Sequence, residues 1–188
     1  VKSYYTGGEI NVLIAEEYSR AANGGVGFAK AAGNYAAQFY PTSEALKKGF
    51  QQIIWTDASN HEYLEEAGTM NIFFKIKGTL VTSPTNDRIL DGITRKSIIS
   101  IAKKDGIPVE ERPIKVSEIK EAHENGTLEE IFGTGTAVVV LPIHSFSHQN
   151  KSYSLPKETP LALQLKEKLV GIQYNLGEDP FNWRQAVD

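Results

Sequence analysis

The chain has 188 residues, of which 40% are hydrophobic and 23% charged, and this composition predicts a soluble globular unit with one good hydrophobic core. A formal net charge of -3 with scattered lysines argues against nucleic acid and against an anionic membrane as partners. The sequence has no cysteine, which excludes thiolate metal sites and thiol nucleophiles and fits a cytoplasmic location.

The first part of the chain predicts a strand, a glycine-rich loop, a helix and a second strand. A short β-prone run covers residues 12–15, and the glycines of "GGVGFAK" (24–30) then require a loop. A helix is expected over about residues 34–48, with Pro41 ending or kinking its first half. The run "QQIIWT" (51–56) predicts a buried strand.

The middle of the chain predicts strands followed by a helix. Residues 62–84, "EYLEEAGTMNIFFKIKGTLVTSP", read as two or three strands, with Lys77-Gly78 as the turn of a hairpin. The spacing of apolar residues after "DG" then predicts a helix that begins near Ile93 and is closed by Gly106.

The last part of the chain continues the irregular alternation of strands and helices. An edge strand is expected in "PVEERPIK" (108–115), followed by a helix that Ser117 caps and that ends at about Glu124. Residues 129–146 predict a strand, a glycine turn and a strand, and residues 160–174 an amphipathic helix. The hairpins favour a mixed α/β domain, a mixed sheet with flanking helices, over a doubly wound parallel fold.

Lys30 stands in a run of glycines and alanines, where a tight, dry environment would lower the pKa of its amine and make it a nucleophile. The alternative is a solvated surface lysine, which is the common case. The stretch lacks both the Gly-Lys-Ser/Thr of a P-loop and the G-x-G-x-x-G of a dinucleotide fold, so both of these phosphate sites are excluded.

Three further stretches carry candidate chemistry, each beside a plain structural alternative. Glu65 and Glu66 are adjacent on a predicted strand, so one must face inward, where a carboxylate can hold a proton on a heterocyclic nitrogen. The helix start in "DGITR" (91–95) offers N–H groups to a phosphate, or is an ordinary helix start. "FGTGTA" (132–137) offers small residues and hydroxyls to a carboxylate, or is a plain turn.

A metal site and a membrane span are both unexpected. His144 and His148 have i,i+4 spacing, but they follow a predicted strand and have no third ligand nearby. The longest apolar stretch, residues 137–143, is far too short to cross a bilayer.

Four stretches, taken in order, match one enzyme family. They are "GGVGFAKAAGNYAAQ" (24–38), "EEAGTMNIFF" (65–74), "RILDGITRKSI" (88–98) and "IFGTGTAVVVLPI" (131–143). From about Tyr4 to Trp183 the chain resembles the carboxy-terminal part of branched-chain amino acid aminotransferases, which are pyridoxal-phosphate enzymes of fold type IV, similar in fold to D-amino acid aminotransferase. The resemblance therefore implies pyridoxal 5'-phosphate as the cofactor.

The resemblance implies cofactor-binding roles for residues in the first three stretches. Lys30 would be the catalytic residue, forming a Schiff base with the cofactor and moving the proton during the reaction. Tyr35 would bond the phenolic oxygen of the cofactor, Glu66 would keep its ring nitrogen protonated, and Leu90 would pack on the ring.

The same resemblance implies how anionic groups are held. Ile93 and Thr94 would bind the cofactor phosphate through backbone N–H groups, with the Thr94 hydroxyl helping. Thr136 and Ala137 would supply N–H groups to the substrate carboxylate and the phosphate region.

The reaction implied is ping-pong transamination, in which leucine, isoleucine or valine gives its amino group and 2-oxoglutarate takes it to become glutamate. Family members are homodimers with a smaller amino-terminal domain, which we expect to be missing because the chain starts at Val1 and its only methionine is Met70. We therefore expect residues 1–188 alone to be weakly active or inactive. The alternatives are a D-amino acid aminotransferase, an aminodeoxychorismate lyase, or an inert binding or oligomerisation module.

Overall fold

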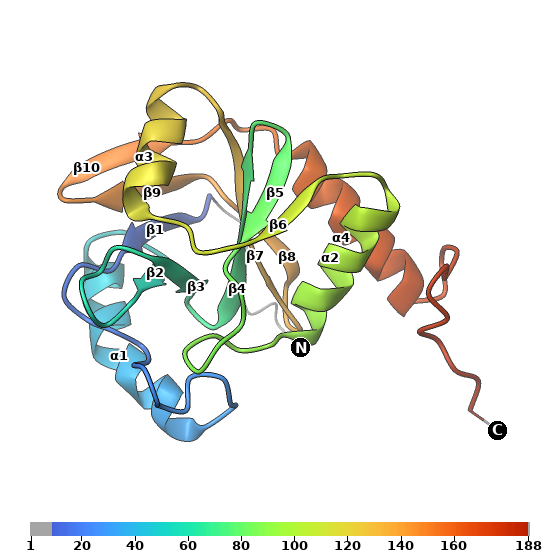
Figure 1. Ribbon diagram of the computed structural model, residues 1–188, viewed down its shortest axis with the longest axis horizontal. Coiled ribbons are helices and arrows are strands. Elements are labelled where there is room, and N and C mark those ends of the chain that lie inside the picture. The colour runs from blue at the N-terminus through green and yellow to red at the C-terminus, as the bar shows by residue number, and fades with distance from the viewer. Residues whose placement is uncertain (1–8, 188) are drawn as a thin grey trace.

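The computed structural model describes residues 9–187, so Tyr4, near which the resemblance begins, lies outside them. Figure 1 shows a curved sheet with helices packed around it. The strands are β1 (Asn11–Ile14), β2 (Gln52–Thr56), β3 (Leu64–Ala67), β4 (Met70–Ile76), β5 (Thr79–Thr82), β6 (Val109–Glu111), β7 (Leu128–Gly135), β8 (Val139–Ile143), β9 (Ser145–His148) and β10 (Lys151–Ser154). The helices are α1 (Ala32–Lys47), α2 (Ile93–Lys104), α3 (Val116–Glu124) and α4 (Pro160–Gln173).

The described strands form one mixed sheet of ten. Its main order is β10-β9-β1-β2-β3-β4-β5-β6, with β7 paired to β4 and to β8. The pairs β1–β2, β1–β9 and β5–β6 are parallel, and the remaining pairs are antiparallel. The sequence prediction of a mixed α/β domain with hairpins is therefore confirmed.

Two local predictions about strands are also confirmed. Lys77 and Gly78 join β4 to β5 with φ angles of 49° and 76°, which are the positive values that a tight hairpin turn needs at both central residues. The predicted edge strand is β6, which ends the main strand order.

The helix predicted over about residues 34–48 is α1, in which Pro41 does not end the helix, whereas the predicted cap at Ser117 is wrong. Helix α1 does not end at Pro41 but continues to Lys47, because Pro41 is buried and the carbonyl that loses its donor belongs to the exposed Ala37, where water can bond it. Ser117 does not cap α3, which starts one residue earlier. The Val116 amide instead donates to the carbonyl of Glu62 at 2.8 Å, so a tertiary contact replaces the cap.

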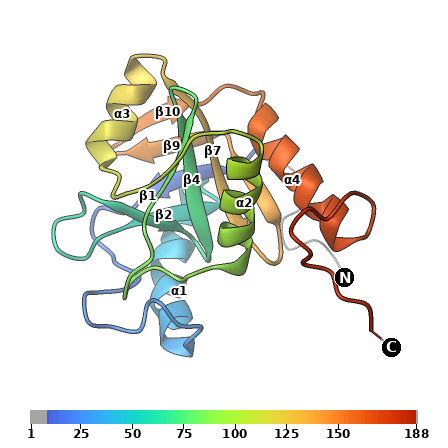
Figure 2. The ribbon, with the colours of Figure 1, turned by 45° about the vertical axis from the view of Figure 1, so that its right-hand side comes forward.

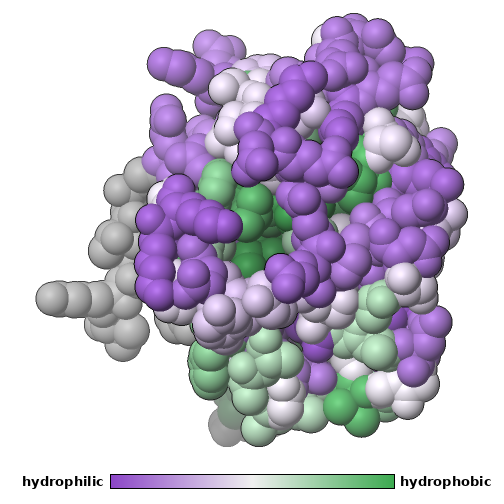
Figure 3. All heavy atoms as spheres, turned by 90° about the vertical axis from the view of Figure 1, so that its left-hand side faces the viewer, coloured by the Kyte–Doolittle hydropathy of each residue, from purple (hydrophilic) through white to green (hydrophobic). Residues whose placement is uncertain are grey.

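Helix α1 buries polar residues beside apolar ones and leaves large aromatic residues exposed. Its buried residues include Asn34 and Gln38, whereas Phe39 and Tyr40 are exposed. Figure 3 shows the corresponding face, where pale green atoms gather in the lower part that holds α1. An amphipathic surface helix normally buries its aromatic side chains. Here the Tyr40 ring packs edge to face against Tyr18, with 5.7 Å between the ring centroids, but both rings stay largely exposed and Phe39 is 73% exposed.

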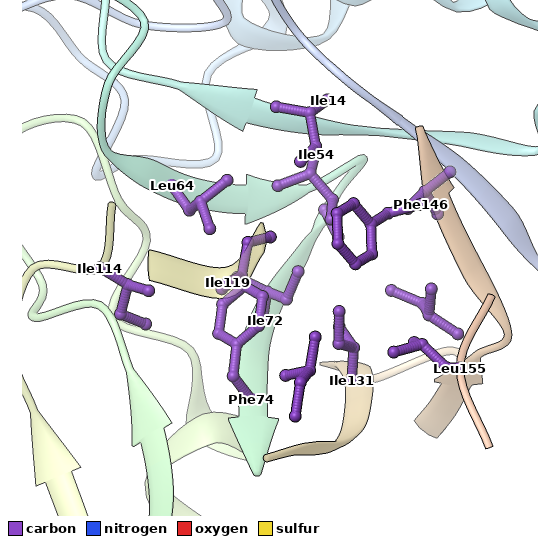
Figure 4. Close-up of a cluster of buried hydrophobic side chains, with 14 of the residues drawn as sticks. Ile14, Ile54, Leu64, Ile72, Phe74, Ile114, Ile119, Ile131, Phe146 and Leu155 are labelled. Carbon is purple, nitrogen blue, oxygen red and sulfur yellow. The ribbon is translucent and has the colours of Figure 1, made fainter. Parts of the chain in front are cut away.

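The two faces of the sheet carry separate hydrophobic clusters. One joins the sheet to α3, and Figure 4 shows Ile72, Phe74 and Ile131 meeting Ile119 of that helix. The other includes Phe73 and packs against α2 and α4, which lie side by side in Figure 2. Neighbouring residues of β4 thus serve both clusters, which holds this strand rigidly between the helices.

Candidate active site

A cavity of about 400 Å³ opens where β3, β4 and β7 meet the start of α2. Its lining brings together most of the residues that the sequence singled out, from four separate parts of the chain. They are Lys30, Glu66, Thr69, Met70, Asn71, Leu90, Asp91, Gly92, Ile93, Thr94, Thr134, Gly135, Thr136, Ala137 and Val138. A volume of this size suits a small organic ligand.

Lys30 lies at the rim of the cavity, near the end of the loop between β1 and α1 (residues 15–31, the lysine loop). Within the described residues its side chain is exposed, so these residues alone do not supply the tight, dry environment considered for Lys30. Tyr35 does not line the cavity, but its ring centroid lies 5.9 Å from the Lys30 Nζ, at cation–π distance.

Asn34 fixes the lysine loop, a role that the sequence prediction missed. Its buried side-chain amide donates to the carbonyls of Val26 and Ala29, both at 2.8 Å. The two bonds fold the chain back on both sides of Phe28, just before Lys30, so the amine is presented from a fixed piece of backbone. The sequence signal that could have indicated this role is the polar Asn34 between Gly33 and Tyr35.

Both glutamates at the end of β3 are buried, so the prediction that only one faces inward is wrong. Glu65 and Glu66 are each 3% exposed. Strand alternation does point them to opposite sides, but both sides of β3 are covered, and each carboxylate meets an arginine, Arg88 and Arg20 respectively.

The Glu66 carboxylate lines the cavity, and each of its two oxygens contacts a different partner. Its Oε1 accepts the amide N–H of Leu90 at 2.8 Å, and its Oε2 lies 3.1 Å from the Arg20 Nε. Burial raises the pKa of Glu66 to about 7, although Arg20, the Leu90 amide and Lys30 act in the opposite direction. Near neutral pH this carboxyl can therefore hold or give up a proton in response to a ligand.

Asn71 links Glu66 to the loop that leads to α2 (residues 83–92, the Leu90 loop). It pairs with Glu66 across the β3–β4 hairpin, and its amide donates to the Leu90 carbonyl at 2.8 Å. A Cβ on Gly92 would lie 2.1 Å from the Asn71 Oδ1, so a larger residue there would displace the Asn71 side chain. The sequence prediction missed Asn71, since its place opposite Glu66 depends on the hairpin register.

The start of α2 faces the turn after β7 across the cavity. Gly92 precedes α2 without a side-chain cap, so amide N–H groups of the first turn, those of Ile93 and Thr94 included, lack intrahelical acceptors. Thr94 is buried, whereas the Ile93 side chain is exposed. Across the cavity, Thr136 and Ala137 are exposed at the turn. This end of the cavity suits an anionic group.

Thr134 also lines this end of the cavity and was missed by the sequence prediction. It is buried, and its Oγ1 has no hydrogen-bond partner. It stands opposite Asn71 in the β4–β7 pairing, so a polar row crosses β3, β4 and β7 along the floor. A buried hydroxyl without a hydrogen-bond partner lowers the stability of the fold, so this polar group is kept here at a cost in stability.

Residues 9–187 hold neither a cluster of side chains that could bind a metal ion nor a helix that could span a membrane. No group of three or more metal-ligating side chains occurs there, and His144 instead accepts the Ile10 amide at 3.0 Å through its Nδ1. None of the helices in this part of the chain has the length and apolar character needed to cross a bilayer.

Comparison with known proteins gives a consistent family. A family model described as amino-transferase class IV matches residues 13–146. The chain is 43% identical to branched-chain-amino-acid aminotransferase 2 of Bacillus subtilis (strain 168), in a match that covers 100% of this chain and 53% of that protein. The chain thus spans about half the length of the curated relatives it matches.

Solved structures agree with the sequence comparison. The branched-chain amino acid aminotransferase from Escherichia coli is similar with a TM-score of 0.77 at 28% identity, over 93% of this chain and 56% of that one. The branched-chain amino acid aminotransferase from Thermobaculum terrenum, solved in its PLP-form, shares the fold with a TM-score of 0.74 at 24% identity, over 89% of this chain and 52% of that one.

Proposed function

The chain belongs to the amino-transferase class IV family, and on that premise we propose that the whole protein is a pyridoxal-phosphate-dependent branched-chain amino acid aminotransferase. In this proposal L-leucine, L-isoleucine or L-valine donates the amino group and 2-oxoglutarate accepts it. The names of the curated relatives support this choice over a D-amino acid aminotransferase or an aminodeoxychorismate lyase.

The observation that carries the proposal is the arrangement of three kinds of group around one cavity. An amine stands at the rim, a buried carboxyl lies on the floor, and an uncapped helix start faces a hydroxyl-bearing turn. Pyridoxal phosphate has an aldehyde, a ring nitrogen and a phosphate that need these groups, so the residues fit it. When bound, it supplies the group that takes up the amine and a ring that accommodates negative charge from the substrate α-carbon.

Lys30 and Glu66 have the two chemical roles in this proposal. The Lys30 Nζ attaches the cofactor covalently, and it moves the proton that leaves the substrate α-carbon. Glu66 holds the proton on the ring nitrogen as a carboxylate, and the Arg20 guanidinium 3.1 Å from its Oε2 favours that ionised form. Tyr35, whose ring lies beside the Lys30 amine, bonds the phenolic oxygen.

Backbone donors position the anionic groups. Ile93 and Thr94 bind the phosphate at the start of α2, and Leu90, anchored to Glu66 by its amide, packs on the ring. Thr136 and Ala137, opposite α2, donate N–H groups to the substrate carboxylate. The Leu90 amide is already held by Glu66 without a ligand, which lowers the entropic cost of ordering this loop on binding.

We further propose that the protein is a homodimer and that the outer face of α1 contributes to its interface. Phe28 is 55% exposed and Phe39 73% exposed, within one stretch of chain beside Lys30. Burial of such side chains by a second copy would remove them from water and would also cover the exposed side of Lys30. Phe39→Glu should weaken the dimer in sedimentation, whereas Leu163→Glu, at an exposed position on α4, should not.

The remaining expectations about the whole protein stay predictions. They are the smaller amino-terminal domain, the weak activity of residues 1–188 alone, and the cytoplasmic location. Because the chain spans about half of its relatives, activity is assigned to the whole protein only.

The test is a half-reaction with the purified whole protein loaded with pyridoxal phosphate. L-leucine should convert the absorbance of the bound cofactor and release the 2-oxo acid, and D-alanine should not. Lys30→Ala should abolish the reaction, whereas Lys104→Ala, which removes an exposed lysine outside the cavity, should leave it intact. Conversion by D-alanine alone would replace the substrate assignment.

A further inference from the structure

The adjacent carboxylates at the end of β3 are each matched by an arginine from a different loop. Arg20 of the lysine loop lies against Glu66, Nε to Oε2 at 3.1 Å, and Arg88 of the Leu90 loop bonds Glu65 through its Nε. Arg20 is itself 7% exposed. Burying this many charges is costly unless each is paired, so the four side chains form one interdependent unit.

Each arginine also holds the loop that carries the other. Arg20 donates through its Nη2 to the backbone carbonyls of Gly27, at 3.3 Å, and of Arg88. Arg88 donates through its Nη1 to the side chain of Asn23 in the lysine loop. The lysine loop and the Leu90 loop are therefore cross-linked in both directions beside the cavity.

The two loops are in direct backbone contact between these bonds. A Cβ on Gly27 would lie 2.7 Å from both the Cα and the carbonyl oxygen of Arg88. The Phe28 amide donates to the carbonyl of Asp87 at 3.1 Å. The contact lies only a few residues from Lys30 on one loop and from Leu90 on the other, so a shift of either loop would move groups of the cavity.

Arg20 is also the closest positive charge to the Glu66 carboxylate. The charged groups that act on Glu66 are Arg20 and Lys30, which favour its ionised form, and Glu65, which opposes it. Lys30 is exposed, and Glu65 is paired with Arg88, so the buried guanidinium of Arg20 is the main counter-charge. The Arg20 Nε makes no aligned hydrogen bond to Glu66, so the contact is an ion pair.

We propose that Arg20 is a positioning residue for the cofactor site: its guanidinium orients Glu66 toward the cavity and ties the lysine loop to the Leu90 loop. The proposal rests on the proposed function for its purpose, but the Arg20–Glu66 contact is a property of the protein without cofactor. The residue lies ten positions before Lys30 and outside the cavity lining, so it acts through Glu66 and through backbone rather than on a ligand.

The experiment measures the titration of Glu66 in the whole protein without cofactor. Glutamate is isotopically labelled at the side-chain carboxyl carbon, and the NMR shift of that carbon is followed against pH. The Glu66 signal is identified by its loss in Glu66→Gln. Arg20→Met should move its midpoint upward by at least about one pH unit, since an opposite charge at this distance is removed. Arg20→Lys, which keeps the charge, should move the midpoint back toward the wild-type value, and Arg112→Met, at a surface ion pair, should leave it unchanged.

Hydrogen exchange at the Phe28 amide supplies the second readout. Both Arg20 variants should accelerate its exchange relative to wild type and to Arg112→Met, because both lose the bonds to the Gly27 and Arg88 carbonyls. An unchanged Glu66 midpoint in Arg20→Met would overturn the proposal whether or not pyridoxal phosphate attaches to the protein. A midpoint that moves in a protein that takes up no cofactor would support the Arg20 contact and would overturn the proposed function instead.

Discussion

Replacing Glu66 by glutamine should change how the stability of the cofactor-free protein depends on pH. Burial raises the pKa of this carboxyl from 4.5 to about 7, so the folded protein binds its proton more tightly than the unfolded chain. Between these pH values the folded state becomes less stable as pH rises, because it must give up a proton that it holds well. At about 1.4 kcal/mol per pKa unit, the full cost is about 3 kcal/mol above pH 7.

The assay is urea unfolding of wild type and Glu66→Gln across this pH range. Their difference in unfolding free energy should change by about 3 kcal/mol in favour of the glutamine variant as pH rises from 4.5 to above 7. The Arg20 ion pair forms only with ionised Glu66 and is already included in the Glu66 pKa. The remaining difference between glutamine and the protonated glutamic acid is an offset that is nearly constant with pH, so only the slope is diagnostic.

Glu129→Gln is the matched control for this slope. Burial acts to raise the Glu129 pKa, but bonds from Lys75 and from the Gly78 amide outweigh it and lower the pKa. Its contribution is therefore fully present above the unfolded pKa and is lost only as pH falls below it. The Glu129→Gln difference curve should stay nearly flat from pH 4.5 to above 7 and should change, with the opposite sign, only at lower pH. A Glu66→Gln difference that stays flat across the range would refute the reasoning about burial.

Two further predictions concern close packing. Gly27→Ala should destabilise the protein by about 1–3 kcal/mol, since the new Cβ would meet the Arg88 backbone. Gly33→Ala, with open space around it in α1, should be neutral or stabilising. Chemical denaturation compares the two variants, and equal effects on the unfolding free energy would contradict the contact between Gly27 and Arg88. Ile98→Ala should cost about 2–5 kcal/mol, because Ile98 is fully buried on the inner face of α2. Leu163→Ala, on the exposed side of α4, should cost under about 1 kcal/mol. A small loss at Ile98 would mean that the cluster collapses to fill the cavity.

Local patterns predicted most of the fold. The Lys77-Gly78 turn, the edge strand β6 and the buried stripe of α4 all depend on residues close together in the sequence. The errors at Pro41 and Ser117 arose where a distant contact decides the outcome: burial lets α1 run through a proline, and the Glu62 carbonyl replaces a side-chain cap on α3.

The candidate site shows the same difference between features set by nearby residues and features set by distant contacts. Lys30 and Glu66 were found because their residue types and order are distinctive, and the structure brings both to one cavity. Arg20, Asn71 and Thr134 were missed because their places depend on strand register and on two loops meeting, which no short stretch of sequence encodes. Chemistry is thus easier to predict from sequence than the groups that orient it.

The central claim is that Lys30 is the amine that holds pyridoxal phosphate. The most direct measurement is to incubate the whole protein with pyridoxal phosphate, reduce it with borohydride, and locate the added phosphopyridoxyl mass by peptide mass spectrometry. We predict a single modified peptide that contains Lys30, at one per chain, with no modification in Lys30→Ala. Modification spread over other lysines, or undiminished in Lys30→Ala, would contradict the assignment.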